Sequence, residues 1–235
     1  MAARRVNDIE YRLLKSGQRK TADIVIERDG QVAVRAPEHL SEEQVDAVVE
    51  RKRLWIYKSL AEWRDLNATK LVREWVNGEG FLYLGASYRL LFVQEQEEPL
   101  TLKGGRFCLR RDVVETGGKD AAKRIFEDCY GNKGMRRIRK RVDYFAPKAG
   151  VSPVDIEVRD IGFRWATCSA RTGLSFHWKC MMAPPKIIDY IVVHELCHLH
   201  YSDHSDAFWN EVDKVMPDFA ERKAWLRKNG AALDL

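Results

Sequence analysis

Residues 193–204 read Val-His-Glu-Leu-Cys-His-Leu-His-Tyr-Ser-Asp-His. His194 and His198 are four residues apart, so in a helix both imidazoles project from one face and can bind a single metal ion. Glu195 lies at the edge of that face, where its carboxylate can act without being a ligand itself. Two imidazoles and a carboxylate in an apolar helix are costly without partners, and a metal ion removes that cost. The pattern His-Glu-x-x-His is typical of zinc hydrolases.

The residues before this motif predict a buried helix around it. Pro184 and Pro185 suit the first turn of a helix, where a missing N–H costs nothing. From Ile187 to Leu199 the segment is apolar on nearly every face, which is typical of a helix inside a core. A further helix is expected to begin near Ser205.

His204 is the natural third metal ligand, six residues beyond His198 and after a polar stretch where the helix is expected to end. Metzincins place a third histidine at this distance, but with glycine at the position of Tyr201, and the absence of that glycine argues against a metzincin proper. His200 is a poorer candidate, because it points about 200° around the helix from His198. The alternative third ligands are Asp203, Asp206 and Glu211.

The composition indicates a folded protein that is not secreted. Of its 235 residues, 45% are hydrophobic, enough to bury a core without disulfides. The five cysteines include no Cys-x-x-Cys pair, which favours reduced thiols in a reducing compartment over a disulfide framework or a zinc ribbon. The N-terminus lacks the apolar stretch of a secretory signal, and no run approaches the roughly 18 apolar residues of a membrane span. We therefore expect a cytoplasmic protein without membrane attachment.

Alternating and helical patterns together predict an α+β fold in a single domain, residues 1–235. Residues 1–115 form a β-rich N-terminal region with one helix, from the Ser41 N-cap to about Leu66. Residues 116–235 form a helical part that carries the His-Glu-x-x-His motif and a loop over 166–173. A charged helix is expected over about 121–146, and strands are expected over 9–14, 22–27, 32–35, 80–85, 88–93, 107–110, 154–165 and 174–181.

Three blocks in this order resemble one family. They are Arg164–Ser169, Ala183–Pro185 followed by Ile188–Val193, and His194–Leu199 followed by His204-Ser205 and Phe208-Trp209. With them the chain resembles the YgjP-like metallopeptidases, relatives of the SprT-like and WLM proteins in the zincin superfamily. Ala36-Pro37 and Trp55-Ile56 also fit, so the resemblance covers nearly the whole chain. One departure is Ala166-Thr167, where the family usually has Gly-Ser; alanine is strained there if the family's glycine has a positive φ.

The resemblance implies a zincin-like catalytic part in which His194, His198 and His204 bind Zn²⁺ and Glu195 is the catalytic base. It implies a metallopeptidase or other metal-dependent hydrolase acting on a peptide or protein substrate. Three neutral imidazoles leave zinc an open fourth position, although iron, cobalt or nickel also suit such a site. The candidates for stabilising the oxyanion are Tyr190, Tyr201, Arg164 and His177.

The alternative hypothesis is a non-catalytic, zinc-stabilised module that binds nucleic acid or a protein partner. It depends on Lys133–Arg141, which has six basic residues in nine, and on a formal net charge of +5. Met135, Ile138 and Val142 are spaced as the core face of a helix, which makes the arginines its solvated side and disfavours nucleic-acid binding. Glu195 discriminates between the two hypotheses, because a structural zinc site needs no carboxylate beside its ligands. The sequence predicts no particular oligomeric state.

Overall fold

The computed structural model describes residues 2–17, 19, 21–27, 30–66, 73–162, 164–169 and 173–235. The chain divides into two compact units, Met1–Lys70 and Leu71–Leu235. Both units combine helices with sheets, which confirms the α+β class and the strands near the N-terminus. The strands of residues 80–110 share a core with the helices that follow them, so they belong to the second unit. The interpretation of residues 1–235 as one domain stays a prediction.

The first unit is a four-stranded sheet with two helices. The sheet order is β1-β2-β4-β3, and only the β2–β4 pair is parallel. The strands are β1 (Ala2–Val6), β2 (Ile9–Ser16), β3 (Asp23–Ile26) and β4 (Val32–Pro37). The three predicted strands are present, and β1 is a further one that pairs with β2.

The predicted helix of this unit begins as expected but is interrupted. Ser41 is the N-cap and forms a reciprocal capping box with Gln44. Lys52 then separates α1 (Glu42–Arg51) from α2 (Arg53–Leu66), where one continuous helix was predicted. Apolar residues from the sheet and both helices form the core of the unit, namely Ile9, Tyr11, Leu13, Val32, Val34, Ala36, Val45, Val49 and Ile56.

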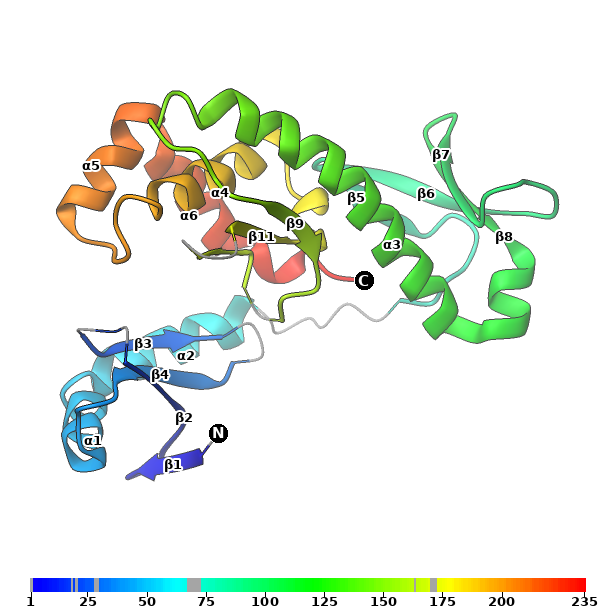
Figure 1. The fold of residues 1–235 in the computed structure, drawn as a ribbon. Helices are drawn as coiled ribbons and strands as arrows, with labels where there is room; N and C mark the ends of the chain where they lie inside the picture. Colours follow the sequence, from blue (N-terminus) through cyan, green and yellow to red (C-terminus); the bar gives the residue numbers. More distant parts are fainter. Residues whose placement is uncertain are drawn as a thin grey trace. The chain divides into compact units, whose positions relative to one another are not determined.

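The second unit contains two sheets joined by a long helix, α3 (Arg111–Phe145), which runs along one side of the unit (Figure 1). One sheet has the order β5-β6-β8-β7, and the other has the order β10-β11-β9. The strands are β5 (Gly80–Tyr83), β6 (Ala86–Val93), β7 (Leu100–Lys103), β8 (Arg106–Arg110), β9 (Ile156–Arg159), β10 (Ala166–Ser169) and β11 (Gly173–His177). Helix α3 starts ten residues before the predicted position, and Gly118 interrupts its helical backbone with a φ of 67°.

The remaining elements follow the second sheet. They are the short 3-10 helix η1 (Trp178–Met182), α4 (Pro185–Cys197), α5 (Asp206–Val215), α6 (Phe219–Asn229) and η2 (Gly230–Ala232). The sequence prediction missed α6, whose apolar residues are only partly buried and lie among charged ones. It also extended the strand after Gly173 too far, because residues 178–182 turn into η1.

Part of the predicted loop 166–173 is a strand. Ala166 pairs with Phe176 in the antiparallel β10–β11 ladder, so it has extended backbone and alanine there is unstrained. Residues 170–172 of that loop lie outside the described residues. Strand β10 also packs against α4, so this segment is part of the surroundings of the helix that carries the His-Glu-x-x-His motif.

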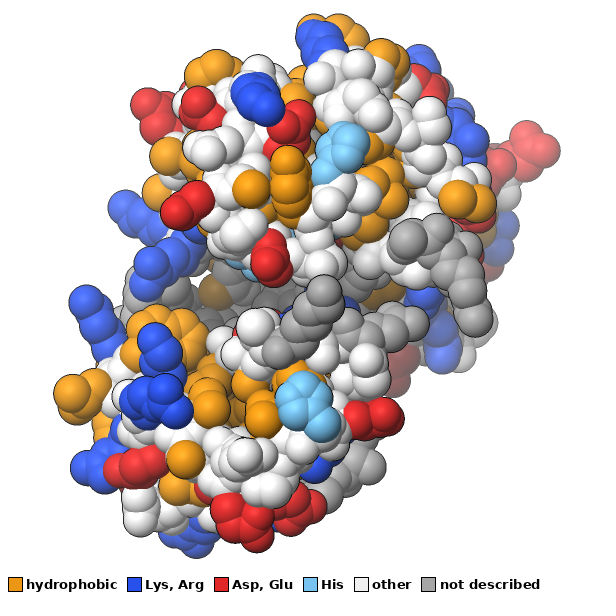
Figure 2. Space-filling model, turned by 60° about the vertical axis from the view of Figure 1, so that its left-hand side comes forward, with side chains coloured by type: hydrophobic (Ala, Val, Ile, Leu, Met, Phe, Trp, Pro, Cys, Tyr) orange, Lys and Arg blue, Asp and Glu red, His pale blue; other side chains and the backbone are white. Residues whose placement is uncertain are grey.

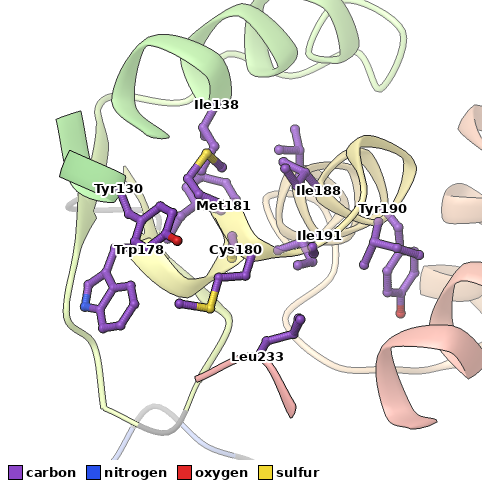
Figure 3. Close-up of a cluster of buried hydrophobic side chains, with 14 of the residues drawn as sticks. Tyr130, Ile138, Trp178, Cys180, Met181, Ile188, Tyr190, Ile191 and Leu233 are labelled. Atoms are coloured by element: carbon purple, nitrogen blue, oxygen red, sulfur yellow. The ribbon is translucent and has the colours of Figure 1, made fainter. Parts of the chain in front are cut away.

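Helix α4 is held in the core of the second unit, as its apolar sequence predicts. Ile188 and Ile191 lie in the cluster of buried side chains between α3, η1 and α4 (Figure 3). In the same cluster, Tyr130 of α3 stacks on Trp178 of η1 with an interplanar angle of 7°. Gly134 allows the close approach of α3, because a Cβ there would lie 3.1 Å from Val158 Cγ1 and 3.2 Å from Met181 Cγ. Among the described residues, no helix is long and apolar enough to cross a membrane.

Candidate metal centre

The structure brings His194, His198 and His204 together. The Nε2 atoms of His194 and His198 are 3.2 Å apart, and those of His194 and His204 are 3.1 Å apart. One ring nitrogen from each of the three lies within 4.8 Å of the others. Within the described ranges, no other group of three or more histidine, cysteine or acidic side chains is arranged to hold a metal ion.

These distances fit a bound cation. Nitrogens placed about 2.05 Å from a tetrahedral zinc ion lie roughly 3.3 Å from each other. The His198 Nδ1–H donates to the Tyr201 carbonyl at 2.9 Å, which leaves the lone pair of Nε2 free for a metal. A donor set of three imidazole nitrogens at nearly the right separation therefore fits a divalent transition metal.

Helix α4 places the first two histidines. Pro184 is its N-cap and Pro185 opens its first turn. The imidazole rings of His194 and His198 are 4.7 Å apart and nearly perpendicular, with an interplanar angle of 88°. The helix ends at Cys197, two residues earlier than predicted, and His198 is its C-cap. The hydrogen bond from His198 to Tyr201 stabilises the turn that leads to His204.

His204 reaches the other two histidines from the segment between α4 and α5. Its side chain is exposed, whereas His194 and His198 are half-buried. Asp203 accepts a hydrogen bond from the Ser205 N–H at 3.2 Å, just before α5 begins. The carboxylate of Asp203 therefore stabilises the turn. Neither it nor the other two acidic alternatives, Asp206 and Glu211, belongs to the histidine group.

Phe208, a residue that the sequence interpretation did not assign to the site, lies against all three histidines. Its ring is 4.5 Å from that of His198, at 28°, and 5.0 Å from those of His194 and His204. Phe208 is fully buried, so it closes the site on the side of α5. His204 precedes α5, so the helical i, i+4 spacing does not predict this contact, which depends on how α5 packs on α4.

The surroundings of His194 and His198 favour their neutral forms. Burial lowers the pKa of His194 well below its ordinary value, and the nearby His198, His204 and Lys223 add to this shift. Burial also lowers the pKa of His198. Because a ligating imidazole must be unprotonated, both shifts favour metal binding near neutral pH.

Glu195 is 6% exposed, and burial raises the pKa of its carboxyl to about 8. The charge of Arg164 acts in the opposite direction. A carboxyl group with a pKa near the operating pH, beside a cluster of metal-type ligands, is typical of a general acid or base. The structure thus places a group suited to proton transfer next to the histidines along α4.

The other residues that the sequence suggested for the site lie outside the group of three histidines. Tyr190 is buried, its ring is 5.8 Å from that of His194, and burial together with the charge of Glu195 raises its pKa. His177 accepts a hydrogen bond from the Lys179 N–H at 3.1 Å and lies 3.4 Å from Asp160, so its ring has partners of its own. The Tyr201 carbonyl is the acceptor for His198. His200 contacts the Ala149 carbonyl at 2.8 Å, in agreement with its rejection as a ligand.

The two cysteines near the motif are poor ligands. Burial raises the pKa of Cys168 to about 11, with a further contribution from the charge of Glu195. Burial also raises the pKa of Cys197 to about 12. Metal ligation needs the thiolate, so both residues suit packing better than ligation.

The basic segment Lys133–Arg141 lies in the last third of α3, and its apolar residues face the core as predicted. Ile138 and Val142 are buried, and Arg141 is paired with Asp189 of α4. Arg136, Arg139 and Lys140 are exposed. Over the face drawn in Figure 2, basic and acidic side chains are interspersed. Nucleic-acid binding by this segment stays a prediction that is not favoured.

Comparison with known proteins shows the family of the chain. The sequence model of the YgjP-like metallopeptidase domain matches residues 20–229, nearly the whole chain, and the chain belongs to this family. No curated protein matches it significantly. Among solved structures, the metallopeptidase zymogen abylysin of Pyrococcus abyssi is similar over 38% of this chain and 90% of its own, with 24% identity and a TM-score of 0.36. The family assignment depends on the family match and not on that superposition.

Proposed function

We propose that the chain is a zinc-dependent metallopeptidase in which His194, His198 and His204 bind the metal and Glu195 is the general base. The observation that carries the proposal is the convergence of three histidine Nε2 atoms, together with the buried carboxyl group of Glu195 on α4, next to His194 in the sequence. Membership in a metallopeptidase family supports a divalent metal and a peptide or protein substrate. The three-imidazole set supports zinc, because catalytic zinc sites commonly have three protein ligands and one open position.

A divalent cation held by His194, His198 and His204 would polarise the peptide carbonyl as a Lewis acid and would lower the pKa of the attacking water. Glu195 accepts a proton from that water as the water oxygen bonds to the carbonyl carbon of the substrate. The same carboxyl then donates the proton to the leaving nitrogen as the C–N bond breaks. In the metal-free site, burial raises the pKa of this carboxyl, which favours its acceptance of a proton.

Two further buried residues, Phe208 and Tyr190, lie beside the histidines. Phe208 excludes water from the α5 side of the histidines, which strengthens electrostatic interactions in the site. Tyr190 is the best placed of the four proposed oxyanion donors, because it is buried beside both His194 and Glu195 and its raised pKa keeps the hydroxyl protonated. All five cysteines are unpaired, in keeping with the proposed cytoplasmic location.

The test is metal analysis of the purified protein together with a Glu195→Gln variant. The change is nearly isosteric and leaves the histidines intact, so zinc content should stay at about one equivalent per chain. Hydrolysis of a mixed peptide library, followed by mass spectrometry, should fall by roughly two or more orders of magnitude. Equal hydrolysis by the variant and the parent would exclude Glu195 as the base.

A further inference from the structure

His204 differs from the other candidate ligands in how it is held. His194 and His198 belong to α4 and its C-cap, whereas His204 lies in the segment between α4 and α5 and has an exposed side chain. An exposed side chain loses rotamer freedom when it becomes a ligand, which weakens metal binding unless the side chain is already ordered. The surroundings of its ring therefore matter for the affinity of the site.

Trp209 supplies such an ordering contact. Its indole is stacked on the imidazole of His204, with ring centroids 5.6 Å apart and an interplanar angle of 22°. Its ring also lies 5.8 Å from that of His194. An indole has no lone pair to offer a metal, so its contribution is to the orientation of the imidazole.

Helix α6 in turn holds Trp209. Phe219 stacks on the indole with a centroid distance of 5.4 Å and an angle of 15°. The ammonium of Lys223 lies 3.7 Å from the centroid of the indole, a cation–π contact. Phe219 and Lys223 are four residues apart, so they project from the same face of α6 and contact Trp209 together.

We propose that Trp209 is a positioning residue that holds the His204 imidazole in its ligating orientation, and that α6 braces Trp209 through Phe219 and Lys223. The inference rests on the proposed metal site. Trp209 stacks between His204 and Phe219, and Lys223 lies over the indole. Through these contacts α6 supports the exposed ligand His204. Outer contacts of this kind typically change metal affinity by about 10- to 100-fold.

The test measures zinc affinity by competition with a chromophoric chelator. Trp209→Leu removes the flat ring and should weaken zinc binding about tenfold or more. Trp209→Phe keeps an aromatic face and should recover most of that loss. The matched control is Trp225→Leu, the same change on α6 at a residue with no described ring contact to the three histidines. It should leave zinc affinity within about twofold of the parent.

A double-mutant cycle separates positioning from a general effect on the fold. In a His204→Ala background, Trp209→Leu should cause no further loss of zinc affinity, because the ligand on which it acts is gone. If Trp209→Leu does not fold, Phe219→Leu carries the same test, since Phe219 braces Trp209 and its change leaves the indole in place. Circular dichroism of the metal-free proteins checks folding.

The outcomes distinguish the two proposals. Unchanged affinity of Trp209→Leu, with a clear loss in His204→Ala, would overturn the positioning role and leave the ligand set standing. An equal loss on changing Trp209 with and without His204 would also overturn it, because the effect would then come from the contact with His194 or from the fold. No loss in His204→Ala would remove His204 from the ligands and refute the proposed site together with this inference.

Discussion

Arg141 of α3 and Asp189 of α4 form a bidentate ion pair, in which Nε lies 2.6 Å from Oδ1 and Nη2 lies 2.9 Å from Oδ2. The guanidinium also lies 4.7 Å from the centroid of Tyr144 and 4.9 Å from that of Phe145. Asp189 is five residues before His194 on α4, so the pair anchors the helix that carries the motif. One arginine of the basic segment is therefore a structural residue.

Loss of this pair should destabilise the fold. Arg141→Gln leaves the partly buried carboxylate of Asp189 without its guanidinium, which should lower the free energy of unfolding by about 1–3 kcal/mol. Urea denaturation of the metal-free protein measures the change. Arg139→Gln, an exposed neighbour, is the control and should stay within about 0.5 kcal/mol of the parent. Equal stability of the two variants would show that the pair contributes nothing.

Removal of a helix ligand should abolish metal binding. His194→Ala and His198→Ala should each purify with far less than the roughly one zinc equivalent expected of the parent. Addition of EDTA should lower the melting temperature of the parent, since a ligand that binds only the folded state stabilises it. It should leave the melting temperature of the two variants unchanged.

His200→Ala is the control for these variants, because the His200 ring contacts the Ala149 carbonyl and does not join the histidine group. It should keep its zinc and its response to EDTA. Full zinc retention in His194→Ala or His198→Ala would contradict the ligand assignment.

The metal-free protein should become more stable at neutral pH when Glu195 is replaced by Gln. Burial raises the pKa of Glu195 to about 8, whereas the unfolded chain has an ordinary glutamate. The folded state then binds the proton more tightly, so the stability that protonation provides is full below about pH 4.5 and is lost as the pH rises from there towards 8. At pH 7 the variant should be more stable than the parent by up to about 3 kcal/mol.

Urea denaturation in EDTA across pH 4.5 to 8 measures this difference, which should vanish towards the acidic end. Glu221→Gln, at an exposed position on α6, should follow the parent at every pH. A constant difference between Glu195→Gln and the parent over the whole range would contradict the raised pKa.

The basic segment should not bind nucleic acid at moderate salt. Arg141 is engaged by Asp189, and the exposed Arg136, Arg139 and Lys140 lie on the solvated side of α3. We expect no binding to single- or double-stranded DNA or RNA at about 150 mM salt. If binding is detected, its log–log salt slope should be about −0.9 per contacted phosphate on duplex DNA, and a triple change of the exposed residues to Glu should flatten it. That result would support the alternative function.

Local rules account for what the sequence could predict. The i, i+4 spacing on a helix is enough to place His194 and His198 on one face, and the capping box of Ser41 and Gln44 sets the start of α1. Long apolar or alternating segments identified α4 and most of the strands. These features depend on neighbours within one or two turns, so the order of the residues determines them.

The tertiary structure decided what depends on distant partners. The parallel pairs β2–β4, β6–β8 and β9–β11 join strands that are not consecutive, and β1 and β7 are strands whose formation depends on pairing with β2 and β8. Helix α6 has a weak apolar stripe, so its packing and not its pattern stabilises it. The meeting of His204 with His194, and the contacts of Phe208 and Trp209 with them, follow from the docking of α5 on α4. The sequence by itself determined which residues are candidates to bind a metal or to transfer a proton. Only packing between elements decided which of them meet, because a side chain's through-space neighbours are set by burial of apolar surface and not by its position in the chain.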